Sequence, residues 1–306
     1  MSESVFSPDI DPPSPTLAAR LRELADYFAA PAAGRLTEEQ RALSLGIARR
    51  MVVEVAARLD AAIDPAALWH EWLDGGLPSA TRLAGVCFAR AEEHRWREQS
   101  AQRTSPPPLL SEPEAANDEA AAVGETSDLD RAYLAVQIAD RRRFDALGNP
   151  AVAIADLDNE TFRTLLFDIA AWRLAEVSRD AKRAAELGDA VRAETERQAA
   201  ESGIADAGRA YYAALGPDAG KAAAAAIARH DWPTLIALAA AAHGRGYDVM
   251  ALALLTAESA ALPALFAPLR LDNIAIAPIE AALAMLPARA VNGADHSDFR
   301  SAERAR

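Results

Sequence analysis

Residues 222–260 read AAAAAIARHDWPTLIALAAAAHGRGYDVMALALLTAESA and contain the clearest structural signals in the chain. The pattern predicts two helices joined by a turn and a third helix capped by Asp248. Arg229-His230-Asp231 ends the first helix, and Pro233 opens the second, because proline fits a first helical turn. Gly244 is expected in the left-handed conformation that closes the second helix, since glycine has no Cβ to clash. The third run is apolar on all sides, which is typical of a buried helix.

The composition favours helices throughout. Of the 306 residues, 51% are hydrophobic but only 6% are aromatic, and much of the apolar content is alanine, the best helix former. Runs of β-branched residues with period-two alternation, which would indicate strands, are missing. We therefore predict an all-α fold, either a helical bundle or an irregular, HEAT-like stack of helical hairpins.

Composition also changes along the chain, and these changes predict two helical modules. The stretch after Thr104 contains Pro106-Pro107-Pro108 among many acidic residues and has no apolar period, which is typical of a linker. The predicted organisation is a disordered arm (1–15), an N-terminal module (16–103), a disordered acidic linker (104–127), a C-terminal module (128–289) and a disordered tail (290–306).

Several helix ends are marked by local signals. Thr37-Glu38-Glu39-Gln40 is a capping box, in which the Thr and Gln side chains satisfy free backbone amides. Asp64-Pro65 and Asp158 each begin another helix. Pro278 is expected in the first turn of the last helix. Residues 179–209 are predicted to form one long, mostly exposed helix with a narrow apolar seam.

The net charge of −13 limits the classes of partner. Because this charge repels phosphate backbones, nucleic-acid binding is not expected, and an anionic membrane surface is disfavoured for the same reason. The polar, acidic start does not resemble a secretory signal, so we expect a cytoplasmic protein. The single cysteine, Cys87, lies among apolar residues and is interpreted as a buried, inert thiol.

Five histidines are the obvious metal candidates, but their spacing does not match that of a zinc site. We interpret them as structural and expect no metal and no cofactor. They are His70, His94, His230, His243 and His296. Arg141-Arg142-Arg143 could bind an anion, although a solvated helix end is the preferred interpretation. The sequence from Gly216 to Lys221 superficially resembles a phosphate loop, but a helix N-terminus explains it better.

One stretch suggests phosphotransfer. His70-Glu71-Trp72-Leu73 is similar to the phospho-accepting box of histidine kinases. In that box a basic residue and a proline follow, whereas here Leu73 replaces the basic residue and no proline follows in register. A signalling phosphotransfer module using His70 or His94 is therefore the alternative function.

Three apolar stretches resemble an uncharacterised alphaproteobacterial domain-of-unknown-function family of alanine-rich, HEAT-like helical proteins. They are Arg229 to Leu235 with Leu252 to Leu255, Leu165 to Arg173, and Leu262 to Leu265 followed by Leu269. The resemblance covers roughly Leu17 to Leu286, with the acidic linker as an insertion. It implies the helical fold and a regulatory or scaffolding role, and it brings no catalytic residues.

The leading hypothesis is a non-enzymatic protein that binds another protein through helical surfaces. Leu187 and Val191 form the apolar seam of the predicted exposed helix, where we expect a docking face. Trp69 and Trp72 are either core residues, which their helical spacing favours, or binding hot spots. The sequence does not identify the partner, and a second copy of the chain is one candidate.

Overall fold

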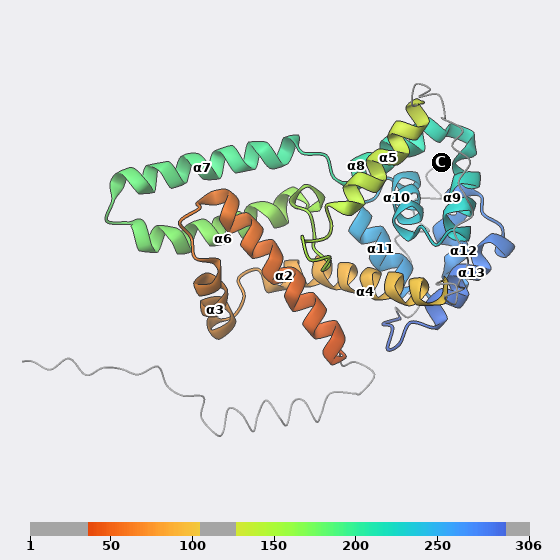
Figure 1. Cartoon of the computed structure of the whole chain (residues 1–306), viewed down its shortest axis with the longest axis horizontal. Helices are drawn as coiled ribbons and strands as arrows, with labels where there is room; N and C mark the ends of the chain where they lie inside the picture. Colours follow the sequence, from red (N-terminus) through yellow and green to blue (C-terminus); the bar gives the residue numbers. More distant parts are fainter. Residues whose placement is uncertain (1–35, 105–126, 292–306) are drawn as a thin grey trace, which may run out of the picture.

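The computed structural model describes residues 36–104 and 127–291, which form a succession of helices (Figure 1). The α-helices are α2 (Glu38–Leu59), α3 (Pro65–Gly75), α4 (Ala80–Thr104), α5 (Asp128–Arg141), α6 (Asn159–Val177), α7 (Ala181–Ala200), α8 (Ile204–Leu215), α9 (Ala219–Ala228), α10 (Trp232–His243), α11 (Tyr247–Thr256), α12 (Leu262–Phe266) and α13 (Asn273–Ala284). Short 3-10 helices are η2 (Ile154–Asp156), η3 (Gly216–Asp218), η4 (Ser259–Ala261) and η5 (Ala267–Leu269).

The all-α prediction is confirmed. Within the two described ranges there is no β-strand, and one isolated antiparallel bridge joins Phe144 to Pro150. None of the helices in this part of the chain has both the length and the apolar character needed to cross a bilayer.

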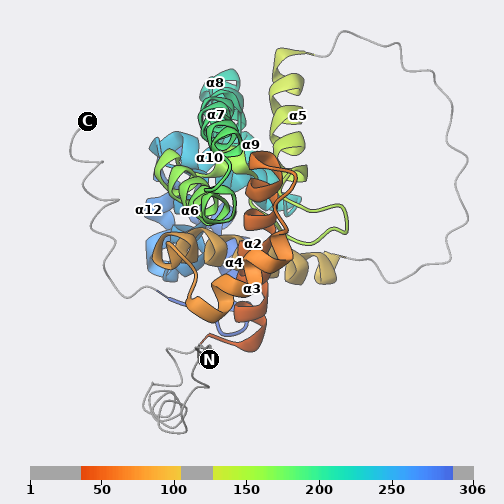
Figure 2. The same cartoon turned by 90° about the vertical axis from the view of Figure 1, so that its left-hand side faces the viewer.

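The helices pack around two hydrophobic cores that meet along α4, which extends from one to the other (Figures 1 and 2). The first core joins α2, α3 and the first half of α4 to η2, α6 and α7. The second joins the end of α4 to α5 and to the helices from α8 to α13. These cores do not divide the chain at residues 104–127, because α6 and α7 follow that stretch in sequence yet bury their apolar faces against the N-terminal helices.

The centre of the second core is α10, as the sequence predicted. Nearly every residue of α10 is buried. Gly244 closes the helix with φ 61°, so the predicted left-handed residue is confirmed. The prediction that Asp248 caps the third helix was wrong: α11 begins at Tyr247 with Gly246 as its N-cap, and Asp248 lies in the first turn. A glycine with extended backbone fills the N-cap position without a side-chain hydrogen bond.

The polar caps at three helix starts are confirmed. Thr37 and Gln40 form both hydrogen bonds of the predicted capping box at the start of α2. Asp64 accepts from the first free amides of α3, and Asp158 does so for α6. Because each signal is completed within four residues of sequence, local chemistry alone was enough to place it.

Two expectations need correction. Residues 179–209 do not form one helix, because the chain breaks between α7 and α8. A Cβ on Gly203 would lie 2.7 Å from the Ala155 carbonyl oxygen, so the close approach of η2 requires glycine there. Pro278 lies inside α13 and not in its first turn, since Asp272 caps that helix from Asn273 onward.

Some predictions fall outside the described residues. These concern residues 1–15, the start of the N-terminal module up to residue 35, most of the linker, and the tail from residue 292 with His296.

Candidate functional site

Buried charged residues in the middle of α4 are the most unusual feature of the molecule. Arg90, Glu92, Glu93 and Arg95 are each at most 4% exposed. Charged side chains are rarely buried unless they are paired. The helix nevertheless continues through this stretch to Thr104.

One side of α4 carries a cluster that we call the polar joint. Its members are Arg90, Glu93, Arg97, Asp140, Arg143, Asp156 and Tyr247. Arg143 donates to both oxygens of the Glu93 carboxylate, at 2.9 and 2.7 Å, and the Tyr247 hydroxyl donates to the same carboxylate at 2.9 Å. Arg97 makes a second two-pronged pair with Asp140, at 2.8 and 2.9 Å.

The positive and negative charges of the polar joint are equal in number. Its three arginines face three carboxylates. Burial alone would raise the pKa of Glu93, but the charges of Arg143 and Arg90 outweigh burial and lower it to about 2. Burial lowers the pKa of Arg90 to about 10 and raises the pKa of Asp156. Glu93 is therefore an ionised anchor at neutral pH.

The polar joint also binds backbone groups, and this links the two cores. Arg90 donates to the carbonyl oxygens of Ala151 and Arg143, at 3.0 and 2.8 Å. Asp156 accepts from the Ile204 amide at 2.7 Å, at the start of α8. Side chains of α4, α5 and α11 and the segment between α5 and α6 thus meet at one place.

This cluster was not predicted from the sequence. The interpretation of Arg141-Arg142-Arg143 as a solvated helix end holds for Arg141 and Arg142 but was wrong for Arg143, which is only 4% exposed. The spacing Arg-x-x-Glu-x-x-x-Arg within α4 was the available signal, because it places three charges on one helical face.

On the opposite side of α4, Arg95 and Glu92 form a second set of buried contacts. Arg95 donates to Glu92 at 2.7 Å, to Glu39 of α2 at 2.9 Å and to the Pro287 carbonyl at 2.8 Å. Gln40 donates to Glu92 at 3.1 Å. These contacts fix the start of α2 and the segment after α13 against α4.

Beside the polar joint lies an open hollow of about 400 Å³ between α4, α5 and the turn joining α9 to α10. His94 lies on one wall, with its Nε2 3.2 Å from the Glu98 carboxylate and its ring edge-on to Phe144. His230 and Asp231 lie on another wall. Arg97 and Asp140 of the polar joint contribute to its lining.

His230 has a backbone conformation that is unusual for its residue type. Its φ of 55° is left-handed, at the second residue after α9, and Gly244 is the left-handed first residue after α10. In both cases a later amide bonds back to the helix: Asp231 to the Ala226 carbonyl, and the residue after Gly244 to that of Ala240. The imidazole of His230 stacks on Trp232, with ring centres 5.2 Å apart. This helix end therefore presents a side chain where glycine would present none.

The two histidines proposed for phosphotransfer lie in different surroundings. The side chain of His70 is 80% exposed, and its Nε2 is 3.5 Å from Asp74. The side chain of His94 is 13% exposed, and burial lowers its pKa. Only His70 is thus accessible enough to meet a phosphodonor directly. Phosphotransfer stays a prediction.

The residues predicted to bind a partner are packed inside the first core. Trp69 and Trp72 are each 6% exposed, and Leu187 is 7% exposed. Val191 is partly buried against the same core. The helix that carries Leu187 is mostly exposed, as expected, but α6 and α2 already cover its apolar seam. Trp69, Trp72 and Leu187 are therefore core residues in this structure, and Val191 is only partly accessible.

Cys87 is buried within the first core, where burial raises the pKa of its thiol to about 12. The sequence-based interpretation of a buried thiol is confirmed.

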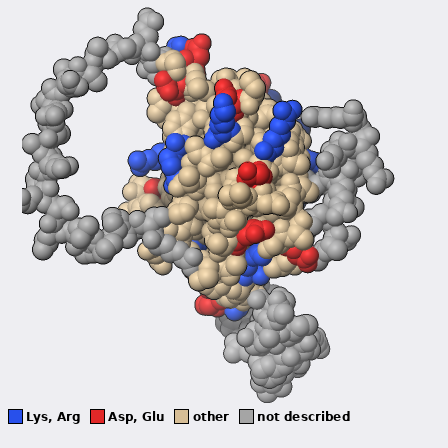
Figure 3. Space-filling view, turned by 90° about the vertical axis from the view of Figure 1, so that its right-hand side faces the viewer, with Lys and Arg blue, Asp and Glu red and all other residues tan. Residues whose placement is uncertain are grey.

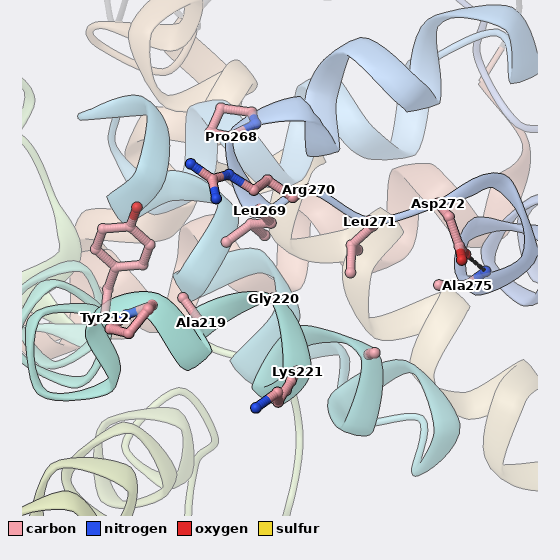
Figure 4. Close-up of a pocket in the computed structure, with 13 residues that line it drawn as sticks. Tyr212, Ala219, Gly220, Lys221, Pro268, Leu269, Arg270, Leu271, Asp272 and Ala275 are labelled. Carbon is pink, nitrogen blue, oxygen red and sulfur yellow. Dashed lines mark hydrogen bonds between the residues drawn. The ribbon is translucent and has the colours of Figure 1, made fainter.

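A second hollow, of about 510 Å³, lies between the start of α9 and the segment from Pro268 to Asp272 (Figure 4). This is where the sequence superficially resembles a phosphate loop. The stretch from Gly216 to Lys221 follows the helix α8, whereas a phosphate loop follows a strand. Lys221 pairs with Asp218 at 2.8 Å and is directed away from Arg270. A Cβ on Gly220 would lie 2.5 Å from the Leu269 carbonyl, so this glycine serves packing.

The face of the molecule around α9, α12 and α13 shows no concentration of either charge. Lysine, arginine, aspartate and glutamate side chains are scattered there among uncharged residues (Figure 3). A large patch of one sign would be the usual mark of an electrostatically steered partner on this face.

The outer face of α5 is different, because apolar and basic side chains lie together on it. Leu134 and Ile138 are 49% and 54% exposed and are one helical turn apart. Arg131, Arg141 and Arg142 flank them and are all exposed. Figure 2 shows α5 at the edge of the described helices, packed on α8 through its other side.

Within the described residues, no group of three or more histidine, cysteine, aspartate or glutamate side chains is placed to hold a metal ion. Comparisons with protein families, with curated proteins and with solved structures give no match for the chain.

Proposed function

We propose that this protein is a non-enzymatic interaction protein that binds an acidic, amphipathic helix of a partner protein on the outer face of α5. The observation that carries the proposal is the pair Leu134 and Ile138, exposed on the side of α5 opposite the buried Val136. Helix-in-groove and helix-on-helix recognition uses apolar anchors at this one-turn spacing.

The charges around this pair support an acidic partner. Arg131 pairs with Asp128, whereas the side chains of Arg141 and Arg142 make no ion pair within the described part of the chain. Although the whole chain carries a net charge of −13, the exposed arginines make this edge positive, and a positive edge complements a negative segment of a partner.

The size of this face of α5 determines the affinity that we expect for the complex. One helix face with two apolar anchors buries less area than a standard interface, so the complex belongs with small, transient ones. Its affinity should depend strongly on salt, because exposed ion pairs are screened within roughly 10 Å at 0.1 M ionic strength.

The test begins by finding what touches this face. A photo-reactive residue at Ala135, which is exposed beside Leu134, is used to cross-link the full chain in the cells that produce it. Mass spectrometry then identifies the cross-linked segment. The identified partner is purified, and its affinity is measured by calorimetric titration against wild type, the double variant Leu134→Asp/Ile138→Asp, and a control.

The control is Leu129→Asp, because Leu129 is a similarly exposed leucine of α5 that lies about 140° around the helix from Leu134. We expect the double variant to weaken binding at least about 10-fold, since two central anchors each contribute about 1–2 kcal/mol. The control should bind within about twofold of wild type.

Four results would overturn the proposal: equal weakening by the control, a cross-linked segment that is not acidic, self-association that the double variant abolishes, and binding to anionic vesicles with no protein partner.

A further inference from the structure

A small cavity lies inside the polar joint, between α4, η2 and α11. It has a volume of about 20 Å³, and the side chains that line it include Arg90, Glu93, Arg143, Asp156 and Tyr247. One water molecule needs about 10–15 Å³ of such volume, and it also needs polar groups to bind. The cavity satisfies the first condition.

Polar groups are available as well. Arg90 Nη1, Arg143 Nε and Asp156 Oδ2 are fully buried atoms without a hydrogen-bond partner among the described residues, and all three belong to residues that line this cavity. Arg143 Nε and Asp156 Oδ2 are 3.6 Å apart, too far for a direct hydrogen bond. A buried polar group without a partner destabilises the folded state, and a charged one does so more strongly.

We propose that this cavity binds one water molecule, which accepts hydrogen bonds from Arg90 Nη1 and Arg143 Nε and donates one to Asp156 Oδ2. Two donors and one acceptor match the bonding capacity of water. The carboxylates of Asp156 and Glu93 disfavour a chloride ion at this position. The guanidinium groups of Arg90 and Arg143 disfavour a sodium ion.

The charge balance of the polar joint agrees with a neutral ligand. Its three arginines and three carboxylates cancel, and Asp248, which also lines the cavity, adds a carboxylate that further disfavours an anion. The bound water joins α4, the segment after α5 and η2, and so forms part of the contact between the two cores.

The first test is a crystal structure of the full chain at a resolution that shows ordered water. We expect a peak about 2.6–3.2 Å from all three atoms. Three outcomes would overturn the proposal: an empty cavity, a direct hydrogen bond between Arg143 and Asp156 that closes it, or an anomalous peak there after a bromide soak, which would indicate an anion.

The second test is made in solution, on the wild-type protein with ¹⁵N-labelled arginine. A long-lived water should give a nuclear Overhauser effect to the Arg143 Nε–H. Arg142 is the matched control, because its exposed side chain meets only bulk water. The proposal fails if the Arg143 signal shows no contact with bound water.

Discussion

Replacing Glu93 by glutamine should be among the most destabilising conservative changes in this protein. Glu93→Gln keeps the shape of a side chain that is 0% exposed but removes the charge that pairs with Arg143 and approaches Arg90 and Arg97. Breaking a buried ion pair on one side costs about 3–5 kcal/mol, because the remaining charge stays buried without compensation. The amide also gives Arg143 only one acceptor oxygen in place of two.

The pKa of Glu93 gives a second value for the same quantity. The difference between its ordinary 4.5 and about 2, at about 1.4 kcal/mol per pH unit, corresponds to about 3 kcal/mol. Because the pKa is lower in the folded state, this stabilisation is fully present above about pH 4.5 and is lost as the pH falls toward about 2. The gap in stability between wild type and Glu93→Gln should therefore close over that range.

The assay is chemical denaturation of both proteins at about pH 7 and about pH 3, with Glu98→Gln as the control. Glu98 is five residues farther along α4, and its side chain is 58% exposed, so its pair with His94 should contribute less than about 1 kcal/mol. The reasoning is refuted if Glu93→Gln costs no more than Glu98→Gln at about pH 7, or if the gap is unchanged at about pH 3.

Three further predictions use other parts of the structure. Gly244→Ala should lower the free energy of unfolding by about 1 kcal/mol, because φ at this position is left-handed, and equal stability in denaturant would contradict this. Leu187→Asp should lower the midpoint of thermal unfolding, since it places a charge in the first core. An unchanged midpoint would show that Leu187 does not stabilise the core, and it would then again be a candidate for partner binding. If the alternative phosphotransfer function holds, a labelled phosphodonor should give acid-labile labelling that His70→Gln removes and His94→Gln leaves intact, because only His70 is exposed; retained labelling in His70→Gln would exclude it as the acceptor.

The features that sequence could predict are those completed within a few residues. Thr37 and Gln40 form their capping box across three positions, and Gly244 closes α10 at the end of an uninterrupted apolar run. The all-α class follows from alanine content and from periodicity, which need no knowledge of distant contacts. Pro278 shows the limit of such reasoning, since an earlier cap at Asp272 moved the start of its helix.

The polar joint could not be predicted in the same way. Glu93 meets Arg143 and Tyr247, which are 50 and 154 residues away in sequence, so no local pattern reveals the partners. Arg143 has the same residue type as Arg141 and Arg142 and follows them directly, and it differs only in pointing into the protein after α5 has ended. For Trp69 and Trp72 the helical spacing favoured a core role but left a binding surface open, and their burial places them in the first core.

The position of the polar joint explains why α4 is charged where it is most buried. In its first half, Val86 and Cys87 pack in the first core, and farther along the helix Trp96 packs in the second. The helix therefore passes from one core to the other between these residues. If the stretch of α4 between the two cores were apolar, it could pack against either core in several alternative positions. Buried ion pairs often add little net stability compared with apolar residues of similar volume, but they need one geometry, and Glu93 reaches its full set of partners only when α11 and the segment after α5 are both in place. The charges on α4 therefore fix how the two cores meet, and α5, which carries the proposed docking face, is held in that same contact through Asp140.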